Sequence, residues 1–191
     1  MDITYKVLPT FAKVHKDKSR YIFVMGPVGS GKSVGCIFHS FLNAMKQHPD
    51  ANGVRHCRHL VVRATYPALK STIVKSYQDW FKDKITFTFS MPIVARIQYP
   101  LSDGTRVDME VLFIAVEDDV AAQKLRSLEI TSAHINEASE ITPGVFSILK
   151  TRLGRYPAAR DGGPVDPFII CDYNAVSTDH WLYKLAEEER P

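Results

Sequence analysis

The sequence predicts an α/β fold in which helices cover both faces of a mostly parallel sheet. Short apolar runs typical of buried strands alternate with stretches of helical periodicity. A glycine-rich phosphate-binding pattern joins the first such run to the first helix, and a hairpin pattern occupies the middle of the chain. With 191 residues, 45% of them hydrophobic and 24% charged, residues 1–191 are expected to form one domain.

Composition excludes several classes of protein. The three cysteines, Cys36, Cys57 and Cys171, form no C-x-x-C pair, which argues against a disulfide framework or a zinc site. The first residues show no secretory signal, and no apolar run approaches the roughly 20 residues that cross a membrane, so no membrane association is expected. The net charge of +3 permits binding to a polyanion without requiring it.

The first strand, predicted at residues 21–25, leads into a G-x-x-x-x-G-K-[ST] phosphate-binding loop. Glycines let the backbone approach a polyphosphate, and the amides that open the next helix form an anion site. Lys32 is expected to reach the β- and γ-phosphates, and the Ser33 hydroxyl to ligate Mg²⁺. The sequence therefore predicts binding of ATP with Mg²⁺ at Gly26, Pro27, Val28, Gly29, Ser30, Gly31, Lys32, Ser33 and Val34.

The elements before the hairpin follow from periodicity and from prolines. Phe11 precedes the first strand, and either an adenine contact or a core contact suits it. Residues 34–46 show a broad apolar helical face, residues 50–58 are polar and predict a loop, and residues 60–62 predict a second strand. Pro67 then lies near the start of a helix that runs to about Lys82.

Alternating apolar residues predict strands at 85–89, 93–99 and 106–116, with a turn at 102–104 that makes the last two a hairpin decorating the main sheet. A short helix at 118–125, a strand at 130–135 and a helix at 143–153 follow. After a loop at 155–164, residues 168–171 predict the last strand. Residues 178–189 predict a closing helix with Ser177 or Thr178 as its N-cap.

Polar residues follow several of these strands. Ligands of parallel sheets gather at the carboxyl ends of the strands, so residues 26–33, Arg63, 136–137 and 172–174 are expected around one crevice. Glu137 is the predicted catalytic glutamate, although a surface Glu that opens the next helix would have the same sequence context. Asn136 stands where a Walker B motif has Asp, so the predicted metal site of Ser33 and Asn136 should bind Mg²⁺ weakly.

Two further roles are assigned from position. Asn174, just past the last strand, is either a sensor of the γ-phosphate or a turn-forming residue. Hydrolysis also needs positive charge, and the candidates are Arg63, Arg126, Arg152, Arg155 and Arg160. Arg126 is preferred because it lies shortly before the Glu137 strand, which gives a predicted catalytic set of Glu137, Arg126 and Lys32.

Taken together, these motifs resemble those of the ATPase half of a tailed-phage terminase large subunit. The likeness rests on their order along the chain: GPVGSGKS (26–33), RATYPAL (63–69), VLFIAV (111–116), KLRS (124–127), INEASE (135–140) and CDYNAVSTDHW (171–181). It implies the additional-strand catalytic-glutamate (ASCE) P-loop fold, with the Asn174 strand between the P-loop strand and the Glu137 strand. It also implies Arg126 as a trans-acting arginine finger and a coupling role for the segment around Asn174.

The resemblance further implies a viral genome-packaging motor that acts in the host cytoplasm and is not part of the mature virion. Its expected partners are double-stranded DNA, a portal protein, a small terminase subunit and further copies of itself in a ring on the capsid. Asn136 departs from the family's Asp. The metal-dependent nuclease domain of the family is not expected within this chain, which ends at Pro191.

Three alternatives remain open on the sequence. A small nucleoside- or shikimate-type P-loop kinase has about this length, and the loop at 152–160 would suit a phosphate-clamping lid. A nucleotide-gated assembly module would bind ATP through Lys32 and hydrolyse little, as Asn136 suggests. A DNA helicase or another translocase would share the ATPase motifs.

Overall fold

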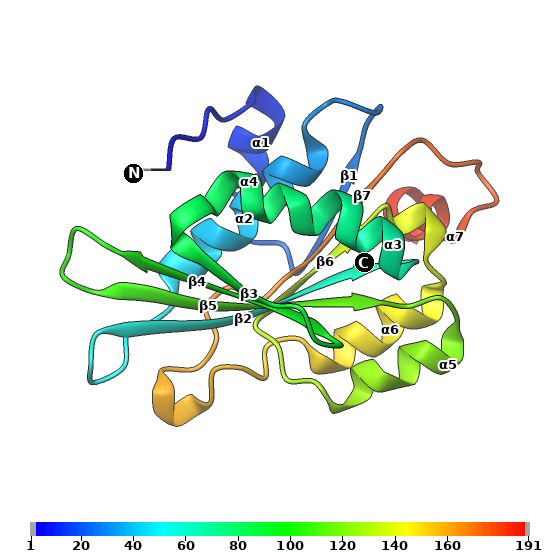
Figure 1. Cartoon of the computed structure of the whole chain (residues 1–191). Coiled ribbons are helices and arrows are strands. Elements are labelled where there is room, and N and C mark those ends of the chain that lie inside the picture. The colour runs from blue at the N-terminus through cyan, green and yellow to red at the C-terminus, as the bar shows by residue number, and fades with distance from the viewer. Residues whose placement is uncertain (1–2, 190–191) are drawn as a thin grey trace.

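Seven strands form one sheet in the order β1-β7-β6-β2-β5-β4-β3 in the computed structural model, which describes residues 3–189 (Figure 1). The two residues at each end of the predicted domain lie outside the described range. The first five strands in that order pair in parallel, and β4 and β3 add two antiparallel pairs at one edge. The strands are β1 Tyr21–Met25, β2 Val54–Arg63, β3 Ile85–Thr88, β4 Ile93–Pro100, β5 Arg106–Ala115, β6 Ser132–Asn136 and β7 Ile169–Tyr173.

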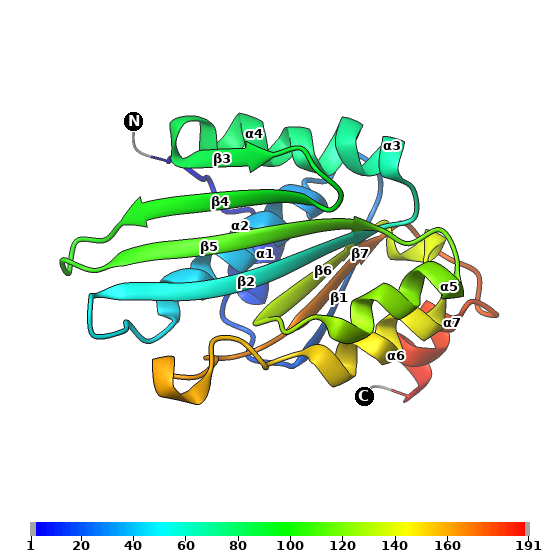
Figure 2. The same ribbon diagram turned by 60° about the horizontal axis from the view of Figure 1, so that its bottom comes forward.

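Helices cover both faces of this sheet, as the sequence predicted (Figure 2). On one face, α2 (Lys32–Lys46) packs beside a helical segment made of α3 (Tyr66–Ala68), a π-helical stretch (Leu69–Val74) and α4 (Lys75–Phe81). The opposite face packs against α5 (Asp119–Ala122), α6 (Pro143–Arg152) and α7 (Trp181–Tyr183), while α1 (Pro9–Val14) lies against β1 and α2. Every residue of β6 and β7 is buried, because both faces of these central strands are covered.

The strand order places β7 between β1 and β6, as the resemblance implied. Because these three strands are parallel, their carboxyl ends lie at the same edge of the sheet. None of the helices among residues 3–189 is long and apolar enough to cross a membrane.

One predicted loop and the predicted placement of the hairpin are wrong. Residues 54–58, predicted as part of a polar loop, form the first half of β2. Their polar side chains find partners on neighbouring elements, since Arg58 pairs with Glu110 on β5 and Arg55 Nη2 lies 2.7 Å from Asp103 Oδ2. The predicted hairpin of β4 and β5 is confirmed, but β5 also pairs with β2 over ten residues and is part of the main sheet rather than an addition to it.

The closing helix begins later than predicted. Its first residue is Trp181, and the N-cap is His180, whose Nδ1 accepts from the Leu182 amide at 3.2 Å, rather than Ser177 or Thr178. His180 Nε2 lies 3.2 Å from the Ser139 carbonyl, and Trp181 Nε1 donates to the Ile141 carbonyl at 2.9 Å. The start of the helix is therefore set by contacts with the loop after β6.

Phe11 is a core residue. Its side chain is only 2% exposed and packs with β1, β7 and α2, so of the two roles considered for it the structure selects the core contact. The ring lies over Gly35, where an added Cβ would be 2.3 Å from ring carbons.

We therefore expect Gly35→Ala to destabilise the protein. The helix-propensity gain of about 1 kcal/mol is outweighed by an overpacking cost of about 1–3 kcal/mol, because a buried ring has no free space to move into. Urea denaturation of the two proteins measures the difference. In a Phe11→Leu background, where the smaller side chain relieves the contact, Gly35→Ala should cost less than it does alone. An alanine variant as stable as the parent protein would contradict this packing.

Candidate active site

The loop between β1 and α2 leaves backbone amides available at the start of a long helix. Gly29 and Gly31 have φ angles of 77° and 78°, a conformation that glycine adopts without strain. Gly31 is the N-cap of α2, and no side chain in the described part of the protein caps that end. The first amides of a helix have no partners within the helix, so this end of α2 has the free donors that an anion-binding site needs.

Lys32 lies beneath this loop. It is only 7% exposed, and its Nζ donates to the carbonyls of Gly26 (2.7 Å) and Pro27 (2.9 Å) and to Asn174 Oδ1 (3.1 Å). A buried ammonium is tolerated only where acceptors surround it, and here three oxygens do so. Its charge is therefore held at the loop where the sequence predicts the phosphates.

Asn174 links Lys32 to Glu137. Its Nδ2 donates to Glu137 Oε2 at 3.4 Å, while its Oδ1 accepts from the lysine. An ammonium only donates and a carboxylate only accepts, so these partners determine which way the amide faces. The predicted base, sensor and P-loop lysine are thus joined by hydrogen bonds, so the structure brings these three residues together.

The backbone at Glu137 is unusual. Directly after β6, this residue has φ 53° and ψ 56°, a left-handed conformation uncommon outside glycine and costing about 1–3 kcal/mol. Only a three-residue 3₁₀ turn (Ala138–Glu140) follows, and α6 starts at Pro143. Glu137 therefore does not open a long helix, and its half-buried carboxylate is held beside Asn174.

A second group of polar side chains lies next to Ser33. The Ser33 hydroxyl donates to Asp172 Oδ2 at 2.7 Å. Asn136 Nδ2 donates to both oxygens of Asp172 (3.0 and 3.2 Å) and contacts Ser33 Oγ (3.2 Å), and its Oδ1 accepts from Arg63 Nη1 at 2.6 Å. Sequence reasoning placed Asp172 near the crevice but gave it no role. A role for Asp172 could be inferred only from its position beside Asn136. That position follows from the pairing of β6 with β7, which the sequence alone does not show.

Asp172 is a fully buried carboxylate with a full set of partners. Its Oδ1 also lies 2.7 Å from His134 Nε2. Burial acts to raise the pKa of Asp172, but the adjacent His134 and the hydrogen bonds from Ser33 and Asn136 outweigh burial and lower that pKa. The carboxylate is therefore ionised at neutral pH.

The neighbouring Cys36 completes a buried cluster, since one ligand atom each of Cys36, His134 and Asp172 lies within 4.8 Å of the others. Burial raises the pKa of the Cys36 thiol well above its usual value, so the thiol is neutral. Both Asp172 oxygens already accept hydrogen bonds, from Ser33, His134 and Asn136, so Asp172 is a buried charge surrounded by donors.

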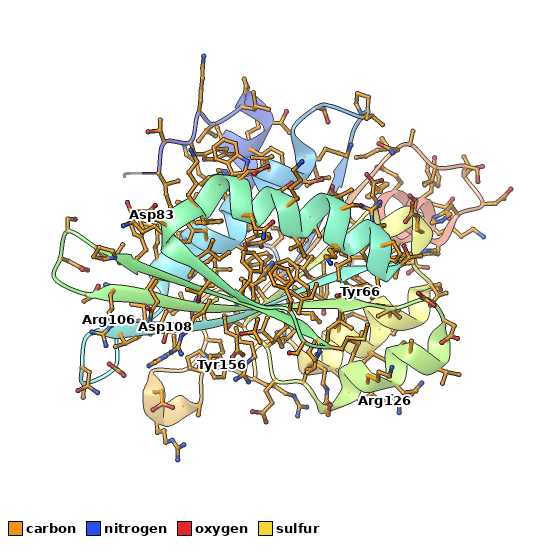
Figure 3. The ribbon with its side chains drawn as sticks, in the orientation of Figure 1. Tyr66, Asp83, Arg106, Asp108, Arg126 and Tyr156 are labelled. Atoms are coloured by element: carbon orange, nitrogen blue, oxygen red, sulfur yellow. The ribbon has the colours of Figure 1, made fainter. Side chains whose placement is uncertain are left out.

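Two of the candidate arginines, Arg63 and Arg126, lie in different surroundings. Arg63, at the end of β2, contacts Asn136 and has its Nη2 3.9 Å from Glu140 Oε2, so it lies beside the polar group around Ser33. Arg126 is exposed in a 3₁₀ turn (Gln123–Ser127) after α5, where its carbonyl accepts from Arg152 Nη1 at 2.8 Å (Figure 3). No hydrogen bond or ion pair within residues 3–189 joins the Arg126 side chain to the P-loop or to Glu137.

Comparison with known proteins identifies the fold. No family model matches the chain, and no curated protein matches its sequence. Among solved structures, the large terminase of a thermophilic bacteriophage superposes with a TM-score of 0.64 at 14% identity, over 91% of this chain and 39% of that protein. Other structures of the same terminase contain ADP or ATP-γ-S.

Two shorter proteins also superpose on this chain. A mutant ATPase domain of the Thermus phage P74-26 large terminase superposes with a TM-score of 0.58 at 14% identity, over 95% of this chain and 70% of that one. The N-terminal domain of the bacteriophage phi29 DNA packaging ATPase gives 0.55 at 17% identity, over 94% of this chain and 85% of that one. The chain therefore has the α/β fold of these ATPase domains of phage DNA-packaging proteins.

Proposed function

We propose that this chain is the ATP-hydrolysing motor domain of a viral terminase large subunit, which drives double-stranded DNA into a procapsid. The observation that carries the proposal is the bridge from Lys32 through Asn174 to Glu137 at the carboxyl ends of β1, β7 and β6. This bridge connects Lys32, which would hold the γ-phosphate, with Glu137, which would activate water. The terminase fold is the second support.

In this proposal each residue has a distinct task. The amides at the start of α2 and the Lys32 ammonium hold the β- and γ-phosphates. Glu137 orients a water molecule and accepts its proton as the water oxygen bonds to the γ-phosphorus and the bond to the β–γ bridging oxygen breaks, releasing ADP and phosphate. Asn174, hydrogen-bonded to both charged groups, would pass the change at the γ-phosphate to β7, which ends one residue before it.

The residues present also suit a magnesium ion. Ser33 offers a hydroxyl oxygen, and the ionised Asp172 lies directly beneath it, which is the hard-oxygen environment that this cation prefers. When bound, Mg²⁺ would neutralise charge on the phosphate oxygens. Arg126 would supply the remaining positive charge from a neighbouring copy in a ring, whose further partners would be the portal and the small terminase subunit in the host cytoplasm.

ATPase activity as a function of protein concentration, with and without duplex DNA, tests the proposal. Specific activity should rise with concentration and with DNA, because the site is completed by a second subunit. A specific activity independent of both would contradict a motor. Loss of ATP only in the presence of a small-molecule acceptor would favour the kinase.

The placement of Arg126 is tested by mixing variants. Arg126→Ala and Glu137→Ala should each be inactive alone, and their mixture should regain part of the activity, since a mixed ring contains some intact sites. The highly exposed Arg160 provides the control, and Arg160→Ala should remain active. A mixture as inactive as its components would argue against a trans role.

A further inference from the structure

Two neighbouring strands place an amide and an acid side by side at this site, and the amide stands where the acid was expected. Asn136 ends β6, where an acid is the usual residue, and Asp172 is its register partner on β7. Both side chains are buried and hydrogen-bonded to one another. The negative charge therefore lies one strand nearer to the P-loop strand, because β7 is the strand that pairs with β1.

The amide of Asn136 is oriented away from a metal-binding role. Its oxygen accepts from Arg63, and a guanidinium has only donors. Its nitrogen faces Asp172 and Ser33, and a carboxylate has only acceptors. Arg63 and Asp172 therefore require the same orientation of the Asn136 amide. In this orientation the amide nitrogen lies beside Ser33, and the amide oxygen does not face a cation held there.

Asp172, in contrast, has the contact that a metal-site acid needs. It accepts the hydroxyl proton of Ser33, the P-loop residue predicted to ligate the cation. Burying a charge costs several kcal/mol unless it is compensated, and the surrounding donors His134, Ser33 and Asn136 provide that compensation. The structure therefore places a negatively charged carboxylate next to the phosphate-binding loop, where it would attract a cation.

We propose that Asp172, rather than residue 136, is the acidic group of the magnesium site. Ser33 holds the ion, Asp172 supplies the negative charge, and Asn136 acts as a positioning residue that ties Asp172 to Arg63. The inference rests on the proposed function, because the ion enters together with the nucleotide. It also removes the reason to regard the site as disabled by Asn136.

The test compares the parent protein with Asp172→Asn, Asn136→Asp and the double exchange variant that carries both changes. Mn²⁺ serves as the probe, and its binding in the presence of ADP is followed by electron paramagnetic resonance. The affinity for ADP without metal is measured separately by calorimetry. Asp172→Asn should weaken Mn²⁺ binding by about 10- to 100-fold while leaving metal-free ADP affinity nearly unchanged.

The other two variants show whether Mn²⁺ binding depends on the presence of a carboxylate beside Ser33 or on the strand that carries it. The double exchange variant should recover most of the lost Mn²⁺ affinity, since a carboxylate again adjoins Ser33. Asn136→Asp alone should change the affinity little, because two adjacent carboxylates repel and one of them takes up a proton. Asp108→Asn is the control: this buried acid pairs with Arg96 near the amino end of β5, away from the site, and its loss should not alter Mn²⁺ binding (Figure 3).

Several results would overturn the inference. One is a folded Asp172→Asn protein, checked by circular dichroism, that binds Mn²⁺ as the parent does. Another is an Asn136→Asp protein whose Mn²⁺ affinity rises by about tenfold or more, the range expected for restoring a missing metal partner. Should Asp172→Asn fail to fold, Asn136→Asp and the double exchange variant decide the question. Failure of the proposed function looks different: ATPase activity would then be independent of protein concentration and DNA, and failure of nucleotide binding itself would appear as a parent protein that does not bind ADP.

Discussion

Lys32→Ala should abolish tight ATP binding. A hydrogen bond to a charged group contributes about 1.5–3 kcal/mol, and the Lys32 ammonium is expected to contact both the β- and the γ-phosphate. Removing it also leaves the Gly26 and Pro27 carbonyl oxygens without the ammonium that now donates to them. We expect the affinity to fall by about 100-fold or more, which corresponds to about 2.7 kcal/mol.

Calorimetric titration with ATP-γ-S measures this loss without interference from turnover. Lys46 is the matched control, because it lies in the last turn of the same helix, α2, at the end away from the phosphate-binding loop. Lys46→Ala should bind the nucleotide as the parent does. Unchanged affinity in Lys32→Ala would contradict the assignment of the phosphate-binding loop itself.

Glu137→Ala should bind ATP with near-normal affinity and hydrolyse almost none of it. Positioned acid–base groups contribute about 10²- to 10⁴-fold to rate, and the loss should lie within that range. Because Glu137 contacts Asn174 and not the loop amides, its removal leaves the phosphate-binding groups in place. Glu137→Gln should be equally slow, since the neutral amide keeps the shape but cannot take the proton.

Phosphate release at saturating ATP gives the rate, and calorimetry gives the affinity. Glu140 offers a close control: it is the last residue of the 3₁₀ turn that follows Glu137, is exposed, and carries the same charge. Glu140→Ala should retain most of the activity. A Glu137→Ala protein that turns over normally would remove this residue from the mechanism and leave only a nucleotide-binding domain.

The local features of the chain were predictable because they depend on neighbours in sequence. The strand at Tyr21–Met25 and the loop that follows are encoded by a continuous apolar run and by glycine spacing. The helix from Pro143 likewise begins and ends where proline and periodicity indicate. The first half of β2 was missed because its polar residues are stabilised by partners such as Glu110, 52 positions from Arg58.

The sequence by itself determined that a phosphate-binding loop joins the first strand to a helix, and that Glu137 and Asn174 each follow a strand. It did not determine the role of Asp172, whose neighbours Ser33 and Asn136 come from distant parts of the chain. That role depends on strand order and register, which are decided by the packing of the whole sheet. Only the tertiary structure could show that the charge expected at residue 136 lies one strand away.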